Sequence, residues 1–246
     1  MKKTQIIKTL CLAIAFVFAA NISQAQFRQS VYLDGAMPVG SWATTTLKTI
    51  PGISTFTDNV PLSPANMGKT ASIGFGGGYR AQYLFDVGVG EVAPFANVDV
   101  IWNTVNKTVN NAYTQHNMTS TQYINVPVFV GVMYQYDRLF SNITIYGEAG
   151  IGADFFFMTP EGDRSNSNLW YAYKPTGTVA GEIGAGAYFG RYFSAGIHYY
   201  ILGEHTVDMT AKTAENHSAE QTYYTTAGNR ETRNLGALML RIGFHL

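Results

Sequence analysis

The sequence has little cysteine and little charge. Its single cysteine is Cys11, and charged residues make up 13% of the 246-residue chain, against roughly 25% in ordinary globular domains. The lack of cysteine beyond residue 11 excludes the disulfide frameworks of small secreted proteins and any cysteine-based metal site. The low charge leaves no basic patch of the kind that binds nucleic acid.

The first 25 residues have the pattern of a cleaved secretory signal peptide. Three lysines at positions 2, 3 and 8 precede the apolar run Thr9–Ala20, and the small residues Ser23 and Ala25 form a cleavage signal. We therefore predict a signal peptide over 1–25 and one exported domain over 26–246. Loss of the three lysines takes the 16 basic residues to 13 against 16 acidic ones, a net charge of −3.

The exported chain also lacks any long segment with the 3.6-residue period of a helix, and it alternates instead. In 121–157 a bulky apolar residue recurs at every second position from Ile124 to Tyr136, and an apolar series restarts at Ile143. Alternation of this length predicts two strands, each with one apolar face. Glu148 and Asp154 lie on the opposite, glycine-bearing face. This pattern is typical of a membrane barrel, in which the apolar face meets lipid and the polar face lines the interior.

The same alternation predicts eight strands along the chain. They cover 30–40, 70–85, 91–106, 121–136, 143–157, 173–189, 193–205 and 234–246. Short turns at 86–90, 137–142 and 190–192 alternate with long polar loops at 41–69, 107–120, 159–171 and 206–233. This rhythm indicates an all-β fold, an eight-stranded antiparallel up-and-down transmembrane β-barrel. The alternative fold is a soluble, lipocalin-like barrel.

Aromatic residues gather at both ends of the predicted strands. Such bands are favoured at the two interfaces of a membrane, whereas the core of a sandwich would place rings in mid-strand as readily. We expect the lipid-facing surface and its girdles to include Trp102, Tyr134, Tyr136, Phe155, Phe157, Phe189 and Phe244.

Charged residues fall on the face predicted to point inward. They are Asp34, Arg80, Asp99, Glu148, Asp154, Glu182, His198, Glu204, Arg241 and His245. The first and last strands meet where a barrel closes, so Asp34 and Arg241 are a candidate pair. Arg80 is within reach of Asp34, Glu148 or Glu182. Eight strands leave an interior that side chains fill, which favours a salt-bridged core without a continuous pore. The functional alternative is a gate or polar conduit.

Four segments resemble the small outer-membrane β-barrel family of Gram-negative bacteria, the OmpA/OmpX-like eight-stranded group. They are SVYLDGAMPVG (30–40), GFGGGYRAQYLF (74–85), YINVPVFVGVMYQY (123–136) and LMLRIGFHL (238–246). The resemblance implies an outer-membrane location and handling by the barrel assembly machinery. The family's last strand usually ends in an aromatic residue, whereas this chain ends in Leu246 with Phe244 two positions earlier.

These observations predict an outer-membrane protein with a structural or surface-interaction role. Its partners would be outer-membrane lipid, the assembly machinery and an extracellular ligand held by loops 41–69 and 206–233. One alternative is a small pore or transporter for small solutes. Another is a lipid-modifying barrel enzyme using Glu204, His205 and Asp208 near the outer rim. No nucleophile motif and no His or Cys pair with ligand spacing is present, so the sequence predicts no catalytic residue, cofactor or metal.

Overall fold

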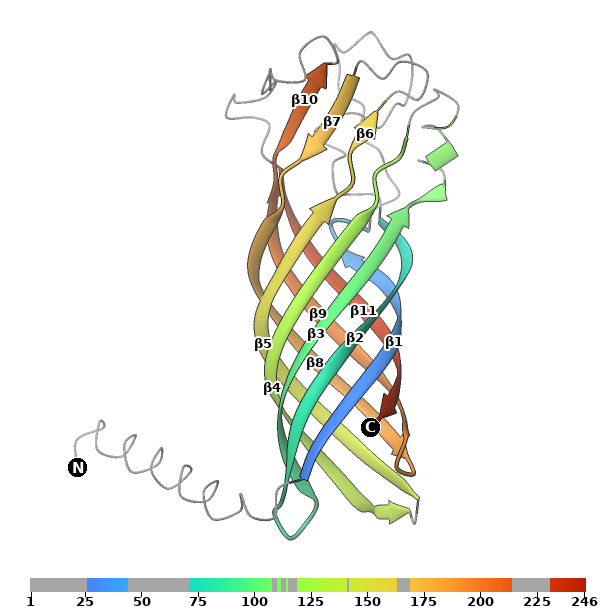
Figure 1. Ribbon diagram of the computed structural model, residues 1–246, viewed down its shortest axis with the longest axis vertical. Coiled ribbons are helices and arrows are strands. Elements are labelled where there is room, and N and C mark those ends of the chain that lie inside the picture. The colour runs from blue at the N-terminus through green and yellow to red at the C-terminus, as the bar shows by residue number, and fades with distance from the viewer. Residues whose placement is uncertain are drawn as a thin grey trace, which may run out of the picture.

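The computed structural model describes residues 26–43, 71–107, 110–111, 114, 119–140, 142–162, 169–213 and 231–246. Eight antiparallel strands form a closed barrel in the order β1-β11-β9-β8-β5-β4-β3-β2 (Figure 1). The bounds are β1 Gln26–Gly40, β2 Ala71–Asp86, β3 Glu91–Val105, β4 Tyr123–Phe140, β5 Ile143–Met158, β8 Thr176–Phe189, β9 Phe193–Val207 and β11 Glu231–His245. The predicted eight-stranded up-and-down barrel is confirmed.

Alternation along each strand decides which side chains enter the barrel. In β1, Tyr32, Asp34 and Ala36 are buried, while Leu33 between them is 75% exposed on the outer surface. The same parity runs through β3, where Asn97, Asp99 and Ile101 are buried. Because successive side chains of a strand point to opposite faces, the polar series fills the interior and the apolar series covers the outside.

The barrel closes between its first and last strands. β1 and β11 pair from Ser30↔His245 to Gly40↔Leu235, and in this register Asp34 stands opposite Arg241. The final backbone amide, of Leu246, donates to the carbonyl of Gln29 at 3.0 Å. The chain is therefore used in the barrel wall to its last residues.

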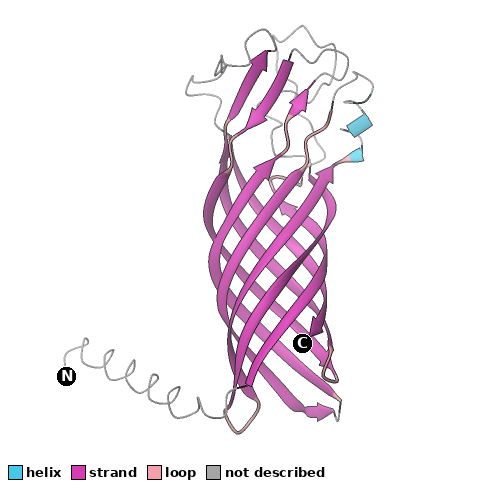
Figure 2. Ribbon diagram, in the orientation of Figure 1, coloured by secondary structure: helices cyan, strands magenta, loops and turns pink. Residues whose placement is uncertain are grey.

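Three short strands stand beyond the barrel end that carries the long connections. β6 (Glu161–Gly162), β7 (Leu169–Tyr173) and β10 (Met209–Thr213) form a separate sheet in the order β10-β7-β6 (Figures 1 and 2). The prediction of plain loops at 159–171 and 206–233 is wrong in these parts. β7 pairs with β10, which lies beyond two intervening barrel strands in the sequence, so neighbouring residues give no sign of this pairing.

Two further segments differ in secondary structure from the sequence prediction. The strand predicted over 173–189 is divided, since β7 ends at Tyr173 and β8 begins at Thr176. Pro175 lies at the break, where the missing N–H of proline cannot contribute to a ladder. In the predicted loop 107–120, Lys107, Asn110, Asn111 and Thr114 are helical.

Among the described residues there is no helix both long and apolar enough to cross a membrane.

A bulge in β9 reverses the parity of its outer end. Gly203 has φ +84°, and the pairing with β11 shifts there, from Gly203↔Leu235 to Ile201↔Gly236. As a result His205 and Val207 are buried, whereas Glu204 is exposed. The prediction that Glu204 points into the barrel is therefore wrong, because one inserted residue flips every later side chain to the other face.

The bulge gives a test of this local geometry. A Cβ at Gly203 would lie 2.4 Å from the Val179 carbonyl oxygen, whereas a Cβ at Gly88, which also has a positive φ of +84°, would meet nothing within 4 Å. Gly88→Ala should cost the backbone strain alone, roughly 1–3 kcal/mol. Gly203→Ala should cost about 1–3 kcal/mol more through the clash. Urea unfolding of the two variants in the same detergent measures the difference, and equal losses would contradict the bulge as described.

Candidate functional site

The outer wall of the barrel is apolar over the length of its strands. Large apolar side chains point outward from every barrel strand, among them Leu33, Ile73, Val130, Ile151, Val179, Ile197 and Leu240. Of the predicted girdle residues, Trp102, Tyr134, Phe155, Phe157, Phe189 and Phe244 are exposed on this wall, and Tyr136 is half-buried. Soluble monomers rarely expose contiguous apolar patches larger than a few hundred square ångströms.

Two clusters of apolar side chains fill much of the interior. Toward the short-turn end, Leu84, Ala93, Phe95, Met133, Tyr146 and Tyr188 form an apolar cluster. A second apolar cluster extends to the long-loop end and includes Ala36, Ile101, Phe129, Leu202 and Val207. The buried charges of the sequence lie in and between these clusters. Of the ten residues predicted to point inward, nine are buried, namely Asp34, Arg80, Asp99, Glu148, Asp154, Glu182, His198, Arg241 and His245, and Glu204 is the exception.

Arg241 is the centre of the first charged group. Its Nε donates to Asp34 Oδ1 at 2.9 Å, and its Nη2 donates to Asp99 Oδ1 at 3.2 Å. The same Nη2 is 2.5 Å from the hydroxyl oxygen of Tyr200, whose O–H donates to Asp99 Oδ2 at 2.8 Å. The guanidinium also lies 3.6 Å from the ring centre of Tyr32, a cation–π contact. Arg241 thus joins β11 to β1, β3 and β9.

Arg80 is the centre of the second group. It donates to both carboxylate oxygens of Glu148, at 2.5 and 2.6 Å, the two-pronged geometry that makes arginine–carboxylate pairs strong. Its guanidinium lies 4.3 Å from the ring centre of Phe95. Of the three carboxylates within its predicted reach, the structure places Arg80 on Glu148. His198 Nδ1 lies 3.0 Å from Glu148 Oε1, and Glu182 accepts from Asn97 Nδ2 at 3.3 Å.

Asp154 belongs to a third group, apart from both arginines. Its Oδ2 lies 3.1 Å from Nε2 of His205, and His205 Nδ1 lies 2.7 Å from the Thr176 hydroxyl. Both side chains of the Asp154–His205 pair are fully buried. Sequence parity places His205 on the outer face, so it does not predict the pair. Gly203 is the one signal that could reveal the shift, because glycine inside a strand often marks a bulge.

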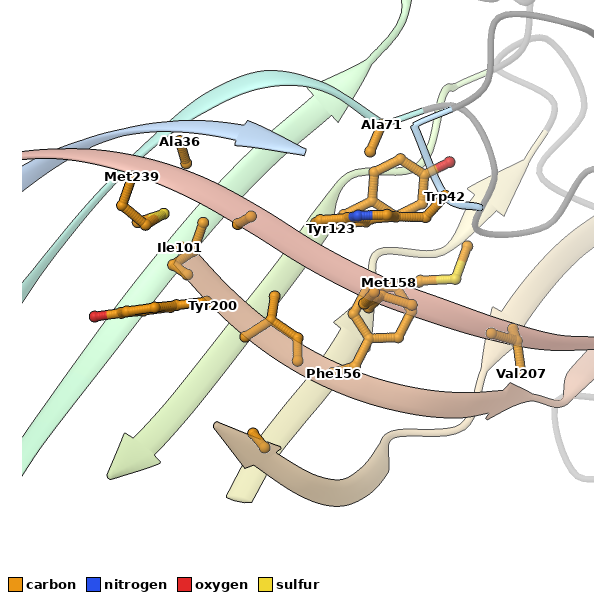
Figure 3. Close-up of a cluster of buried hydrophobic side chains, with 14 of the residues drawn as sticks. Ala36, Trp42, Ala71, Ile101, Tyr123, Phe156, Met158, Tyr200, Val207 and Met239 are labelled. Atoms are coloured by element: carbon orange, nitrogen blue, oxygen red, sulfur yellow. The ribbon is translucent and has the colours of Figure 1, made fainter. Parts of the chain in front are cut away.

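An aromatic cluster lies inside the barrel at the end that carries the long connections. Trp42, just after β1, is fully buried, and its indole N–H lies 2.9 Å from the carbonyl oxygens of both Val39 and Gly236. Its ring packs against Tyr123 and Phe156, with centres 6.1 and 6.2 Å apart (Figure 3). The sequence assigns Trp42 to the loop 41–69, most of which lies outside the described residues. In the tertiary structure Trp42 is a buried residue of the barrel interior.

The fold is a closed, eight-stranded antiparallel β-barrel with a filled interior. No protein-family model matches the sequence, and no curated protein is similar to it. Among solved structures, a major outer membrane protein from Thermus thermophilus is 11% identical, with 90% of this chain and 100% of that chain covered and a TM-score of 0.52. Neisserial surface protein A (NspA) is 12% identical over 90% and 97%, TM-score 0.44. OprG from Pseudomonas aeruginosa is 11% identical over 89% and 95%, TM-score 0.43. At these identities the likeness concerns the fold.

The paired charges predict a large asymmetry between single and double substitutions. Arg80→Met leaves the Glu148 carboxylate buried without its guanidinium and should lower the free energy of unfolding by about 3–5 kcal/mol. Adding Glu148→Leu should restore much of that loss, because two apolar side chains replace the pair. The measurement is urea unfolding of the folded barrel.

Arg191→Met is the matched control, since Arg191 lies exposed in the turn between β8 and β9. Its effect should stay within about 0.5 kcal/mol. A double variant no more stable than Arg80→Met would contradict the pairing of Arg80 with Glu148.

Proposed function

We propose that this protein is a β-barrel of the bacterial outer membrane that carries no solute and acts through its extracellular end, in a structural or surface-interaction role. The observation that supports the proposal is the combination of an apolar outer wall with an interior filled by paired charges and aromatic rings. In this proposal 1–25, outside the described residues, is a signal peptide that is removed on export.

The outer wall supports the membrane location. Antiparallel strands satisfy all their backbone groups only when the sheet closes, which is why closed barrels can cross a bilayer. This barrel is closed, and side chains such as Ile151 (71% exposed) and Val179 (79% exposed) would stand in water if it were soluble. The surrounding lipid is thus the proposed partner of the wall, and the assembly machinery is the proposed partner of β11 during insertion.

The filled interior supports a closed barrel rather than a pore. Trp42, Tyr200 and Met239 are fully buried along its length, and Arg80 and Arg241 are held by carboxylates on several strands. A lipid-modifying enzyme is less well supported. The ring nitrogens of His205, 1% exposed, already contact Thr176 and Asp154, which leaves them no open side toward a substrate.

Recognition is assigned to the end that carries the long connections. The sheet β10-β7-β6 rises beyond the barrel there (Figure 1). Segments 41–69 and 206–233 leave the barrel at the same end, and we propose that an extracellular ligand binds to them. Most residues of these two segments lie outside the described ranges.

Channel activity is the direct test of the closed interior. Purified protein inserted into a planar bilayer should give no large, stable conductance steps, and liposomes that contain it should not release small sugars faster than empty ones. A general porin reconstituted in the same lipid serves as the positive control. Stable steps that scale with the amount of inserted protein would support the pore alternative instead.

A charge placed on the outer wall tests the membrane location. Ile151→Arg, in the middle of β5, should lower the free energy of unfolding in lipid by about 2–4 kcal/mol, whereas Val89→Arg, in the turn after β2, should cost roughly 0–1 kcal/mol. Both positions are exposed, so a soluble barrel would tolerate either arginine within about 0.5 kcal/mol. Equal, small effects in lipid bilayers would contradict the proposed location.

A further inference from the structure

Two carboxylates and one imidazole meet inside the barrel on three neighbouring strands. Glu148, Glu182 and His198 each offer one ligand atom, and these atoms lie within 4.8 Å of one another. We propose that the three residues bind a divalent transition-metal ion of the Zn²⁺ type, as a structural site within the charged interior.

The strand register brings the ligands together. Glu148 of β5 stands opposite Gly184 of β8, and Gly184 stands opposite His198 of β9. Glu182 lies two residues before Gly184, on the same inward face of β8. All three side chains are buried. The ligands therefore come from rigid, mutually hydrogen-bonded strands and not from loops.

Glycines create the space between the ligands. A Cβ at Gly184 would lie 2.3 Å from His198 Nδ1, and a Cβ at Gly150 would lie 2.9 Å from Glu182 Oε1. Gly184 has an ordinary strand conformation, so its backbone does not require glycine. Glycine is needed at position 184 because a side chain there would collide with the His198 imidazole, which approaches the carboxylates.

One ring nitrogen of His198, Nδ1, is placed to bind a metal ion. The His198 side chain is 0% exposed, and its Nδ1 lies 3.0 Å from Glu148 Oε1 without a well-aligned hydrogen bond. Its other ring nitrogen, Nε2, lies 3.3 Å from the hydroxyl of Tyr146. Metal-bound histidines are usually held in this way, with the second ring nitrogen on a hydrogen-bonding group.

The carboxylates are oriented by partners of their own. Arg80 holds Glu148, and Asn97 holds Glu182. A carboxylate oxygen has more than one lone pair, so an oxygen that accepts from Arg80 can still bind an ion. Each of the three ligands is thus supported by a second residue, the arrangement expected of a metal site.

The balance of buried charge also favours a bound cation. In the two arginine-centred groups, the four carboxylates of Asp34, Asp99, Glu148 and Glu182 outnumber the guanidiniums of Arg80 and Arg241 by two. With His198 neutral the sum is −2, and an uncompensated buried charge is costly. One divalent cation makes the sum zero. An imidazole ligand favours zinc, copper, nickel or iron over magnesium or calcium.

The test measures metal in the full-length barrel. The protein is folded in detergent with Zn²⁺ or Co²⁺, passed through a desalting column, and shown to be folded by its heat-modifiable gel migration. We expect about one metal ion per barrel, and a visible Co²⁺ spectrum that indicates nitrogen and oxygen ligands. Glu182→Gln and His198→Gln keep the size of the side chains and should each weaken binding by about 100-fold or more, beyond the roughly 10–100-fold loss from removing a supporting residue.

Two matched pairs of variants isolate the site. His205→Gln changes the other buried histidine beside a carboxylate and should leave the metal content unchanged. Gly184→Ala should reduce binding, while Gly147→Ala should not, because the nearest atom to a Cβ at Gly147 is 4.0 Å away. A folded wild-type barrel that retains no Zn²⁺ or Co²⁺ would overturn the proposal and leave bound protons as the compensating charge. Metal content that Glu182→Gln and His198→Gln leave intact would overturn it as well.

Discussion

Burial of charge behind an apolar wall is the constraint on which the rest of this barrel depends. Arg241 shows it most clearly, because one guanidinium contacts carboxylates of β1 and β3 and the ring of Tyr32. A slip of one residue at the closing seam would turn Arg241 toward the outside and leave Asp34 and Asp99 without their cation. The closing register of β1 and β11 is therefore specified by the interior as much as by the backbone ladder.

The same constraint explains how the interior is organised. Charges can enter only where partners from other strands meet them, so they gather around Arg241, Arg80 and His205. Apolar and aromatic side chains fill the remaining space toward both ends, and Trp42 is fully buried among them at the long-loop end. The interior is thus packed as a core, and we assign function to the segments that extend beyond it.

Parity along a strand follows from the order of residues alone, because successive side chains alternate whatever the strand pairs with. Asp34 in β1 and Glu148 in β5 are buried where their sequence neighbours are exposed. Where the alternation predicts the wrong face or the wrong strand bounds, the cause is a local change in the backbone. Gly203 inserts a bulge, so Glu204 turns outward and His205 turns inward. Pro175 divides a strand that the alternation had joined.

Local alternation and the spacing of turns were enough to establish an eight-stranded barrel with polar residues inside, because both signals depend on residues close together in the chain. These two signals do not show which side chains pair across the interior. Arg80 had three carboxylates within reach, and only the shear of the closed barrel places it on Glu148. The sheet of β6, β7 and β10, the position of Trp42, and the meeting of Glu148, Glu182 and His198 were decided by tertiary structure. Each depends on distances between residues far apart in sequence, which no pattern within one strand records.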